Sequence, residues 1–381
     1  MQRPTRRHFL VLGATLLAGC AGSQTSADDT TAEPASISSP TSSESSSQST
    51  PAGSGRIEAV IPQASKPLPL PSTPEAIRNE ARSGGPPKDG IPSIDDPHFI
   101  TPAEVDFLAP GDPVFGVQHN GVTKAYPQNI LVQHEIVNDT LGDVPATVTY
   151  CPLTGTAMGF RRGSTTFGVS GRLVNNNLIM YDRATETWWP QMLATGIPGP
   201  WEENPPTTSL SEFRVIWTTW DRWQQQHPDT AVLSTQTGHA RNYNNDPYGS
   251  YNSREGYYTT DAAPLFEELN SDDRFPPKKV VMGVRTPAGA AAFVKDTIRS
   301  TGIVRGSIGD DSIIAVYDPR YDTAHAYANP DNRQFKYEGT EIIGIDGTAY
   351  SPDALPLNSL YIFDAMWFAW AGFYPETAVY E

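Results

Sequence analysis

Cys151 is the residue of this chain best suited to covalent chemistry. The 381 residues include two cysteines, Cys20 and Cys151. If Cys20 is lipidated, Cys151 is the remaining thiol and no intramolecular disulfide can form. Cys151 ends the run Ala-Thr-Val-Thr-Tyr-Cys, whose alternation predicts a strand with Thr147, Thr149 and Cys151 on its more polar face. Sites are frequently built where strands meet loops. We therefore expect Cys151 to be a nucleophile or a ligand, with a small buried hydrophobic residue as the alternative.

His134 is the expected partner of Cys151, because it lies on a short predicted helix just before that strand. A neutral imidazole can lower the pKa of a thiol or share a metal ion with it, so we expect the two side chains within roughly 5 Å. Arg161, on the strand after the Cys151 turn, would clamp an anion in the same concavity. The alternative for His134 is a helix-end histidine bonded to backbone.

Other polar residues are candidates for binding a ligand. They are Asn176, Asp182, His239 and Arg241. The last two belong to a Gly-, Asn- and Tyr-rich segment, residues 238–251, which also fits a hydrated surface turn.

Metal binding has weak support in the sequence. Copper is a poor fit because no histidine lies between Cys151 and Met158, and zinc would require more Cys, His or carboxylate ligands at regular spacing. Copper or zinc therefore stays an alternative, with no metal ligand and no cofactor assigned. The sequence also lacks the Gly-x-Ser-x-Gly, phosphate-loop and dinucleotide patterns.

The first 20 residues have the pattern of an export signal. Arg6 and Arg7 precede a short apolar run that ends in Leu-Ala-Gly-Cys20. The twin arginines indicate export of a folded protein, and Cys20 is placed for lipidation after cleavage. We expect a lipid-anchored protein on the extracytoplasmic face of the cell membrane. Residues 21–55 are rich in Ser and Thr and predict a disordered tether.

The charge of the chain restricts its partners. The net charge is −16, from 43 acidic and 27 basic residues, which excludes nucleic acid as a partner because no basic patch exists to neutralise phosphates. The scarcity of lysine and the abundance of aspartate indicate a halophilic source. The remaining partners are the membrane, through the lipid anchor, and a small solute or metal.

The folded part is predicted to be mainly β with short helices (α+β), as an internally duplicated β-rich module that forms one compact unit. Residues 56–113 predict an irregular Pro- and Gly-rich wrap, followed by a first repeat over 114–279 and a second over 280–381. The repeat is indicated by Trp220-x-x-Trp223-x4-Pro-Asp-Thr-Ala-Val, which recurs as Trp367-x-x-Trp370-x4-Pro-Glu-Thr-Ala-Val. Val-Phe-Gly-Val at 114–117 has its counterpart in Val-Met-Gly-Val at 281–284.

Several motifs resemble the family catalogued as domain of unknown function 3179. They are His-Glu-Ile-Val-Asn-Asp at 134–139, Thr-Tyr-Cys-Pro-Leu-Thr-Gly-Thr-Ala at 149–157, Phe-Gly-Val-Ser-Gly-Arg-Leu at 167–173 and Met-Tyr-Asp-Arg at 180–183 with Trp188. Gly-Pro-Pro-Lys-Asp-Gly-Ile-Pro at 85–92 looks like the start of that family's domain, and the similarity extends nearly to the C-terminus. The signal and the acidic composition resemble an exported lipoprotein of haloarchaeal type.

The resemblance implies little chemistry, because the family has no established activity. Some relatives carry Cys-Pro-Leu-Cys where this chain has Cys151-Pro-Leu-Thr154, so a two-thiol redox or metal site is not expected here. We expect a membrane-anchored extracytoplasmic protein with one ligand or active site around Cys151 and His134. The alternatives are a thiol-dependent enzyme with Cys151 as its nucleophile, and a structural or interaction module of the cell surface without an active site.

Overall fold

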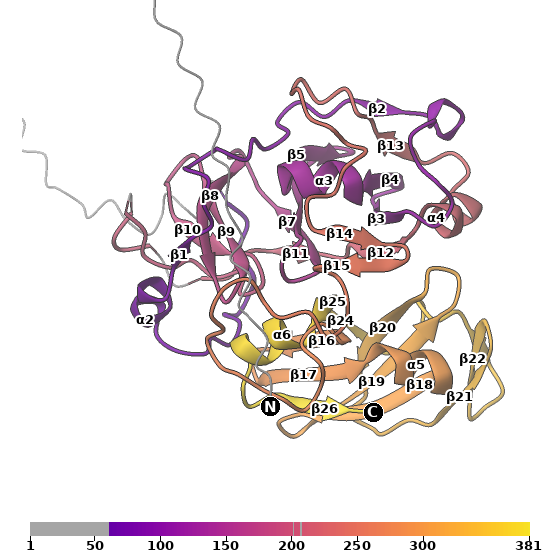
Figure 1. The fold of residues 1–381 in the computed structure, drawn as a ribbon. Coiled ribbons are helices and arrows are strands. Elements are labelled where there is room, and N and C mark those ends of the chain that lie inside the picture. Colours follow the sequence, from indigo (N-terminus) through magenta and orange to yellow (C-terminus); the bar gives the residue numbers. More distant parts are fainter. Residues whose placement is uncertain (1–60, 201, 206–207) are drawn as a thin grey trace, which may run out of the picture. The chain divides into compact units, whose positions relative to one another are not determined.

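The computed structural model describes residues 61–200, 202–205 and 208–381 (Figure 1). The predicted signal, the predicted tether and Cys20 lie outside these ranges. The described part is mainly β, with five short α-helices and one 3-10 turn, which confirms the predicted class. Within these ranges, no helix is long and apolar enough to cross a bilayer.

A first group of strands begins with the predicted hairpin around Asn120-Gly121. Asn120 and Gly121 both adopt positive φ, as a tight hairpin turn requires. The elements of this part are β3 (Pro113–His119), β4 (Val122–Pro127), α3 (Gln128–His134), β5 (Ile136–Leu141), β6 (Val144–Cys151) and β7 (Thr156–Arg161). Strands β5, β6 and β7 form an antiparallel meander with β6 in the middle.

Later residues complete both sheets of this first module. They form β11 (Glu212–Phe213), β12 (Ile216–Thr219), α4 (Trp220–Gln226) and β13 (Ala231–Leu233). The resulting strand orders are β12-β3-β4-β13-β2 and β11-β7-β6-β5, where β2 is Phe99–Ile100. Strand β13 runs parallel to β4, because α4 carries the chain back along the sheet.

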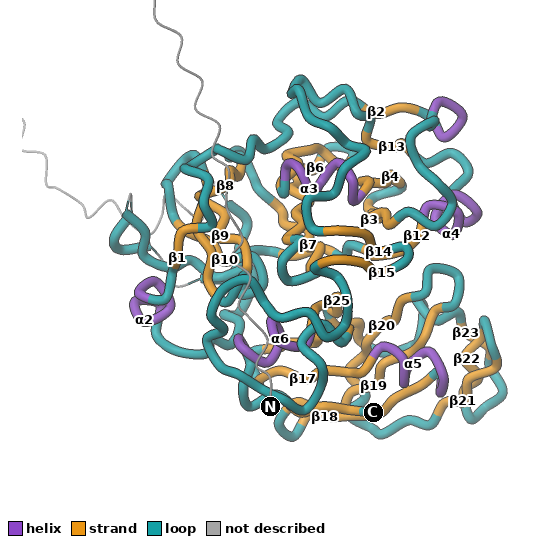
Figure 2. Tube along the Cα trace, viewed as in Figure 1, coloured by secondary structure: helices purple, strands orange, loops and turns teal. Residues whose placement is uncertain are grey.

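A third sheet and two long connections surround this module (Figures 1 and 2). The sheet has the order β1-β8-β9-β10 and consists of Arg82–Ser83, Phe167–Val174, Asn177–Asp182 and Trp188–Pro190. Residues 61–112 are irregular apart from β1, β2, the helix α2 (Pro74–Asn79) and the 3-10 turn Pro102–Glu104. The connection after β13 is mostly loop, interrupted by the hairpin β14 (Gly249–Tyr251) and β15 (Arg254–Gly256).

A second module follows from Val280 onward. Its elements are β16 (Val280–Thr286), β17 (Gly289–Val294), α5 (Lys295–Thr301), β18 (Ile303–Ile308), β19 (Asp311–Asp318), β20 (Thr323–Ala328), β24 (Asn358–Leu360), β25 (Ile362–Met366), α6 (Trp367–Phe373) and β26 (Ala378–Tyr380). A small sheet is inserted between β20 and β24. It consists of β21 (Phe335–Glu338), β22 (Glu341–Gly344) and β23 (Ala349–Tyr350).

The two modules connect their strands in the same order. The second module has the sheets β25-β16-β17-β26 and β18-β19-β20-β24, which correspond strand for strand to β12-β3-β4-β13 and β5-β6-β7-β11. The correspondence extends to side chains, because Trp223 Nε1 and Trp370 Nε1 each donate at 3.0 Å to the threonine seven residues later. Each indole lies against a glycine of the central hairpin. A Cβ added at Gly116 or Gly283 would come within 2.2 Å of it.

Candidate functional site

Cys151 ends β6 inside the core, where 1% of its surface is exposed. Its sulfur accepts the backbone N–H of Leu178 at 3.4 Å and donates to the carbonyl of Asn176 at 3.6 Å. Burial raises the pKa of the Cys151 thiol to about 11. The thiol is therefore protonated near neutral pH. The polar face predicted for this strand exists, but Thr147 and Thr149 on it are fully buried.

His134, at the end of α3, is committed to other partners. Its Nδ1 lies 2.7 Å from the carbonyl oxygen of Pro92, so Nδ1 carries the proton. Its Nε2 then accepts the hydroxyl of Tyr243 at 2.7 Å, and Tyr243 in turn lies 2.5 Å from the Thr237 hydroxyl. Burial lowers the pKa of His134 to about 4, which keeps the ring neutral. Both ring nitrogens are thus bonded away from Cys151, and the structure does not join the expected pair by a hydrogen bond.

Glu135 is a functional candidate that sequence reasoning overlooked. It follows α3 with φ at 60° and ψ at −29°, a left-handed conformation that disfavours every residue except glycine and, to a lesser degree, Asn and Asp. Its side chain is buried, with 6% exposed, and its carboxylate accepts no hydrogen bond from the described residues, although its oxygens are not among the fully buried atoms without a partner. Burial raises the pKa of Glu135 to about 8.

Glu135 and Cys151 are electrostatic neighbours. After burial, the charge of Glu135 is the next largest cause of the raised thiol pKa. Burial and then the same carboxylate raise the pKa of Tyr248, which comes from the long connection after β13. Tyr257 of that connection donates to the carbonyl of Leu153 at 2.7 Å. The connection therefore covers the Cys151 turn, and the acid, the thiol and the Tyr248 phenol form an electrostatically coupled cluster in which the charge of one group affects the pKa of the others.

The equivalent point of the second module has different residues. Helix α5 ends at Gly302, with φ at 77°, where α3 ends at Glu135. The backbone contacts match, since Tyr150 N–H donates to Glu135 O at 2.8 Å and Tyr317 N–H donates to Gly302 O at 2.8 Å. The first module thus places a glutamate where the local backbone favours glycine.

The residue that corresponds to Cys151 is Asp318, which ends β19 in the same way. Burial raises the pKa of Asp318, but hydrogen bonds from His325 and Arg320 outweigh it and lower this pKa to about 2. Asp318 is therefore a paired structural carboxylate. The two modules therefore have different side-chain chemistry at the positions of Glu135 and Cys151.

A network of buried amides and hydroxyls holds the turn after Cys151. Thr154 Oγ1 lies 2.8 Å from Thr156 Oγ1 and accepts from Asn177 Nδ2 at 3.0 Å. Gln191 accepts from Thr156 and Asn177, and donates to Thr149 at 2.9 Å. Thr154 stands where some relatives have a second cysteine, and its hydroxyl is hydrogen-bonded to Thr156 and Asn177 of this network. The network is structural, because its polar side chains satisfy one another.

The remaining predicted ligand residues lie in three different places. His239 and Arg241 do gather around His134. The His239 ring centroid is 5.4 Å from that of His134. Burial is the main cause of the lowered pKa of His134, and the charges of His239 and Arg241 lower it further.

Arg161 pairs with Ala146 at the far end of β7, whereas Cys151 pairs with Thr156 at its start. The structure therefore does not bring Arg161 to Cys151, because the register of the strand separates them by five residues.

Asn176 and Asp182 have structural partners. The Asn176 amide donates to Phe266 O at 3.0 Å and accepts Phe266 N–H at 2.8 Å, which fastens the long connection to the β8–β9 turn. Asp182 is fully buried and accepts from Thr185, from Trp189 Nε1 at 3.0 Å and from two backbone N–H groups. Neither side chain is free for a ligand.

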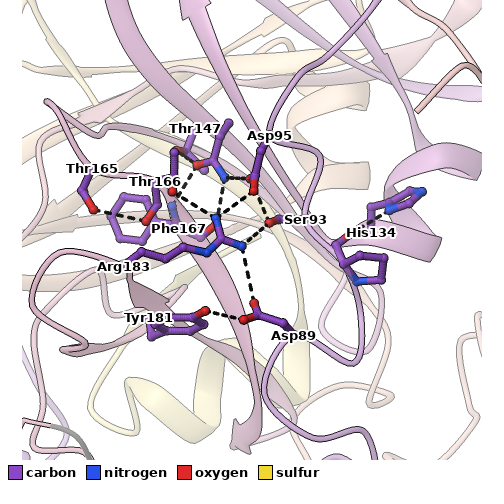
Figure 3. Close-up of polar contacts among 12 residues, drawn as sticks. Asp89, Ser93, Asp95, His134, Thr147, Thr165, Thr166, Phe167, Tyr181 and Arg183 are labelled. Atoms are coloured by element: carbon purple, nitrogen blue, oxygen red, sulfur yellow. Dashed lines mark hydrogen bonds and ion pairs between the residues drawn. The ribbon is translucent and has the colours of Figure 1, made fainter. Parts of the chain in front are cut away.

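Arg183 fastens the segment before β2 onto β8 and β9 (Figure 3). Its guanidinium lies 3.0 Å from Asp95 Oδ2, 2.9 Å from Ser93 Oγ and 3.5 Å from Asp89 Oδ1. Tyr181 donates to the second oxygen of Asp89 at 2.5 Å. The bond of His134 to Pro92 belongs to the same attachment. The motifs at 85–92, 134–139 and 180–183 are therefore joined in space by structural contacts.

No group of three or more His, Cys, Asp or Glu side chains with metal-binding geometry occurs in the described ranges.

No curated protein and no solved structure matches the chain. A family model does match, described as "Protein of unknown function (DUF3179)", and it spans residues 88–377. The matched range contains Glu135, Cys151, the first module and the second module except β26. The chain therefore belongs to the DUF3179 family.

Proposed function

We propose that this chain is an exported, lipid-anchored extracytoplasmic protein with one reactive site, formed by Glu135 and Cys151. The observation that supports it is the Glu135 carboxyl, which is buried without a hydrogen bond and held in a left-handed conformation beside a buried thiol. A strained backbone and a largely buried carboxyl without a protein partner both cost folding free energy, and such costs concentrate at functional sites. The second module avoids both costs with Gly302.

The roles follow from the acid–base properties of the two groups. Glu135, with a pKa of about 8, is the proton acceptor, and Cys151 is the nucleophile of a thiol-dependent enzyme. The thiol proton passes to the carboxylate as the sulfur bonds to an electrophilic atom of the substrate, and the electron pair of the bond broken at that atom goes to the group that leaves it. The cluster as it stands is a resting state, because Tyr248 and Tyr257 cover it and the thiol is protonated.

His134 has a positioning role in this proposal. Its neutral ring holds Pro92 on one side and Tyr243 on the other. It thereby ties the covering connection to the backbone next to Glu135. His239 and Arg241 line the surface above this point, where a small solute would first meet the protein.

The test is the alkylation of Cys151 by iodoacetamide over a range of pH, in a Cys20→Ser background where Cys151 is the single thiol. If Glu135 accepts the proton, the rate rises with an inflection near pH 8, and Glu135→Gln slows labelling and removes the inflection. If the Glu135 charge does no more than oppose ionisation of the thiol, Glu135→Gln speeds labelling instead. The second result would reject the proposal in favour of a binding or structural module.

The duplication is a further part of the proposal. The shared strand order, the paired Trp–Thr bonds and the matching glycines support an origin of the two modules from one ancestral unit. In that history the first module acquired Glu135 and Cys151, while the second stayed a scaffold. The acidic, lysine-poor composition supports a halophilic setting for both.

A further inference from the structure

A cleft lies between the edge strands that correspond in the two modules. Its volume is about 690 Å³, and its lining includes residues of β12, such as Thr218, and of β25, such as Asp364. Helix α5 and the β14–β15 hairpin contribute the other walls. The size is typical of a site for a small organic molecule, for which about 300–1,000 Å³ is usual.

The cleft has a charge balance opposite to that of the chain. Five basic and four acidic side chains line it, whereas the whole sequence has 27 basic and 43 acidic residues. The basic side chains are Arg222, Arg254, Lys279, Lys295 and Arg299. A cation-rich cleft in an acidic protein concentrates anions that the rest of the surface repels.

Two of these cations have no carboxylate partner among the described residues. Arg222 donates to the carbonyl of Pro319 at 2.5 Å, and Arg254 donates to the carbonyl of Lys278 at 3.5 Å. Each guanidinium has five N–H donors, so most of their donors stay available.

The other three cations of the cleft are neutralised by aspartates. Lys279 and Arg299 share Asp296, and Arg299 also pairs with Asp322 at 2.8 Å. Lys295 pairs with Asp364 at 2.5 Å. The fourth acidic residue of the lining is Asp221, next to Arg222 in the chain, so the cleft as a whole has one positive charge more than negative charges, and its cations without a carboxylate partner are the two arginines.

Thr218 provides an independent sign of a missing partner. Its hydroxyl oxygen is buried, the residue is 4% exposed, and the oxygen has no hydrogen-bond partner within the described part of the chain. A buried hydroxyl without a partner costs about 1–3 kcal/mol, so such groups are rare unless something completes them. Thr218 lines the same cleft as Arg222 and Arg254.

We propose that this cleft binds a small polar organic anion, whose carboxylate or phosphate group is held by Arg222 and Arg254 and which bonds the Thr218 hydroxyl. Guanidinium groups recognise both kinds of oxyanion through paired N–H donors. The cleft uses neither Glu135 nor Cys151, so this inference stands apart from the proposed reaction.

The test is calorimetric titration of the purified protein with citrate and with inorganic phosphate as probes, and with glucose as a neutral probe. We expect citrate or phosphate to bind, glucose not to bind, and affinity to fall as salt is raised. The double variant Arg222→Gln and Arg254→Gln should weaken binding at least tenfold. Arg78→Gln, at an exposed arginine of α2 outside the cleft, is the matched control and should leave binding unchanged.

A second variant checks the hydroxyl without threatening the fold. Thr218→Val keeps the shape and removes the unpartnered oxygen, so thermal stability should be kept or improved while the anion binds more weakly. The inference is overturned if neither anion binds, if glucose binds as tightly as the anions, or if Arg78→Gln weakens binding as much as the double variant. Unchanged affinity of Thr218→Val would overturn the assignment of Thr218 to the site.

Discussion

Glu135 and Gly302 end helices α3 and α5 at the same point of the two modules, both in the left-handed conformation. Their N–H groups donate to Leu131 and Ile298 at 2.7 and 2.8 Å, and their carbonyls both accept from a tyrosine. The backbone is thus alike, and the side chain is the difference. A glutamate at this point carries a conformational cost that the glycine does not.

Replacing Glu135 by glycine should therefore stabilise the protein. We expect a gain of about 1 kcal/mol from the backbone conformation, with a further gain from removal of the buried carboxyl. The measurement is the free energy of unfolding by denaturant in high salt. The opposite change, Gly302→Ala, should cost about 2 kcal/mol, because the new Cβ would lie 2.0 Å from the Tyr337 ring and φ is 77°. A destabilised Glu135→Gly would show that the carboxyl has structural partners.

The effect of Glu135→Gln should depend on pH. The folded-state pKa is raised from 4.5 to about 8, so the unfolded chain loses its proton first and the parent protein loses stability as pH rises between these values. Glutamine stays neutral throughout. The stability advantage of the variant should therefore grow from about pH 4.5 to 8 and then level off, at a few kcal/mol by the usual linkage. Unfolding curves at pH 5, 7 and 9 would measure it, and a constant difference would contradict the raised pKa.

His134 should give the opposite dependence on the acid side. Its pKa is lowered from 6.5 to about 4, so its contribution is complete above pH 6.5 and is lost as pH falls toward 4. His134→Gln removes this titration, so the free energy of unfolding that the variant loses between pH 6.5 and pH 4 should be smaller by up to about 3 kcal/mol. Its stability at neutral pH should be lower than that of the parent protein, because the bonds to Pro92 and Tyr243 are weakened. If the parent protein and His134→Gln lose stability in acid with the same pH dependence, groups other than His134 cause the loss.

The hairpin of β3 and β4 could be predicted from the sequence because its signals are local. Asn120-Gly121 between alternating apolar residues specifies a tight turn whatever surrounds it. The similarity of the two Trp-containing segments could also be found in the sequence, since the spacing of the Trp pairs is a property of the chain itself. The separate match of residues 114–117 with 281–284, continued without a gap, places Glu135 opposite Gly302, so this difference could have been found in the sequence.

The partners of His134 and Cys151 could not be predicted because they come from distant residues. Tyr243 lies 109 positions from His134 and takes its Nε2. The Cys151 sulfur forms its hydrogen bonds with Asn176, in the β8–β9 turn, and with Leu178, in β9. Periodicity indicates which face of a strand is apolar, but not which loop covers it. A polar face was expected to mark an accessible site, whereas Asn138 and Gln191 hydrogen-bond Thr147 and Thr149 on that face and bury it.

The network below the Cys151 turn should be costly to interrupt. Asn177→Ala removes an amide that donates to Thr154 and Gln191 and accepts the Met192 N–H at 2.9 Å, so several buried groups lose a partner together. We expect a loss of about 2–4 kcal/mol in the free energy of unfolding. Asn204→Ala, at an exposed asparagine of a nearby loop, is the control and should change stability little. Equal effects of the two substitutions would contradict the structural role of the network.

The lipid anchor is the prediction on which the cellular setting depends. A thiol at position 20, after Leu-Ala-Gly and a twin-arginine front, is expected to become the lipid-bearing N-terminus. Cys20→Ser should therefore release the protein from the membrane fraction, as measured by fractionation and immunoblotting. Cys151→Ser is the matched control, because its thiol is buried in the core and its loss should leave attachment unchanged. If Cys20→Ser stays with the membranes, the protein is held there by something other than a lipid on Cys20.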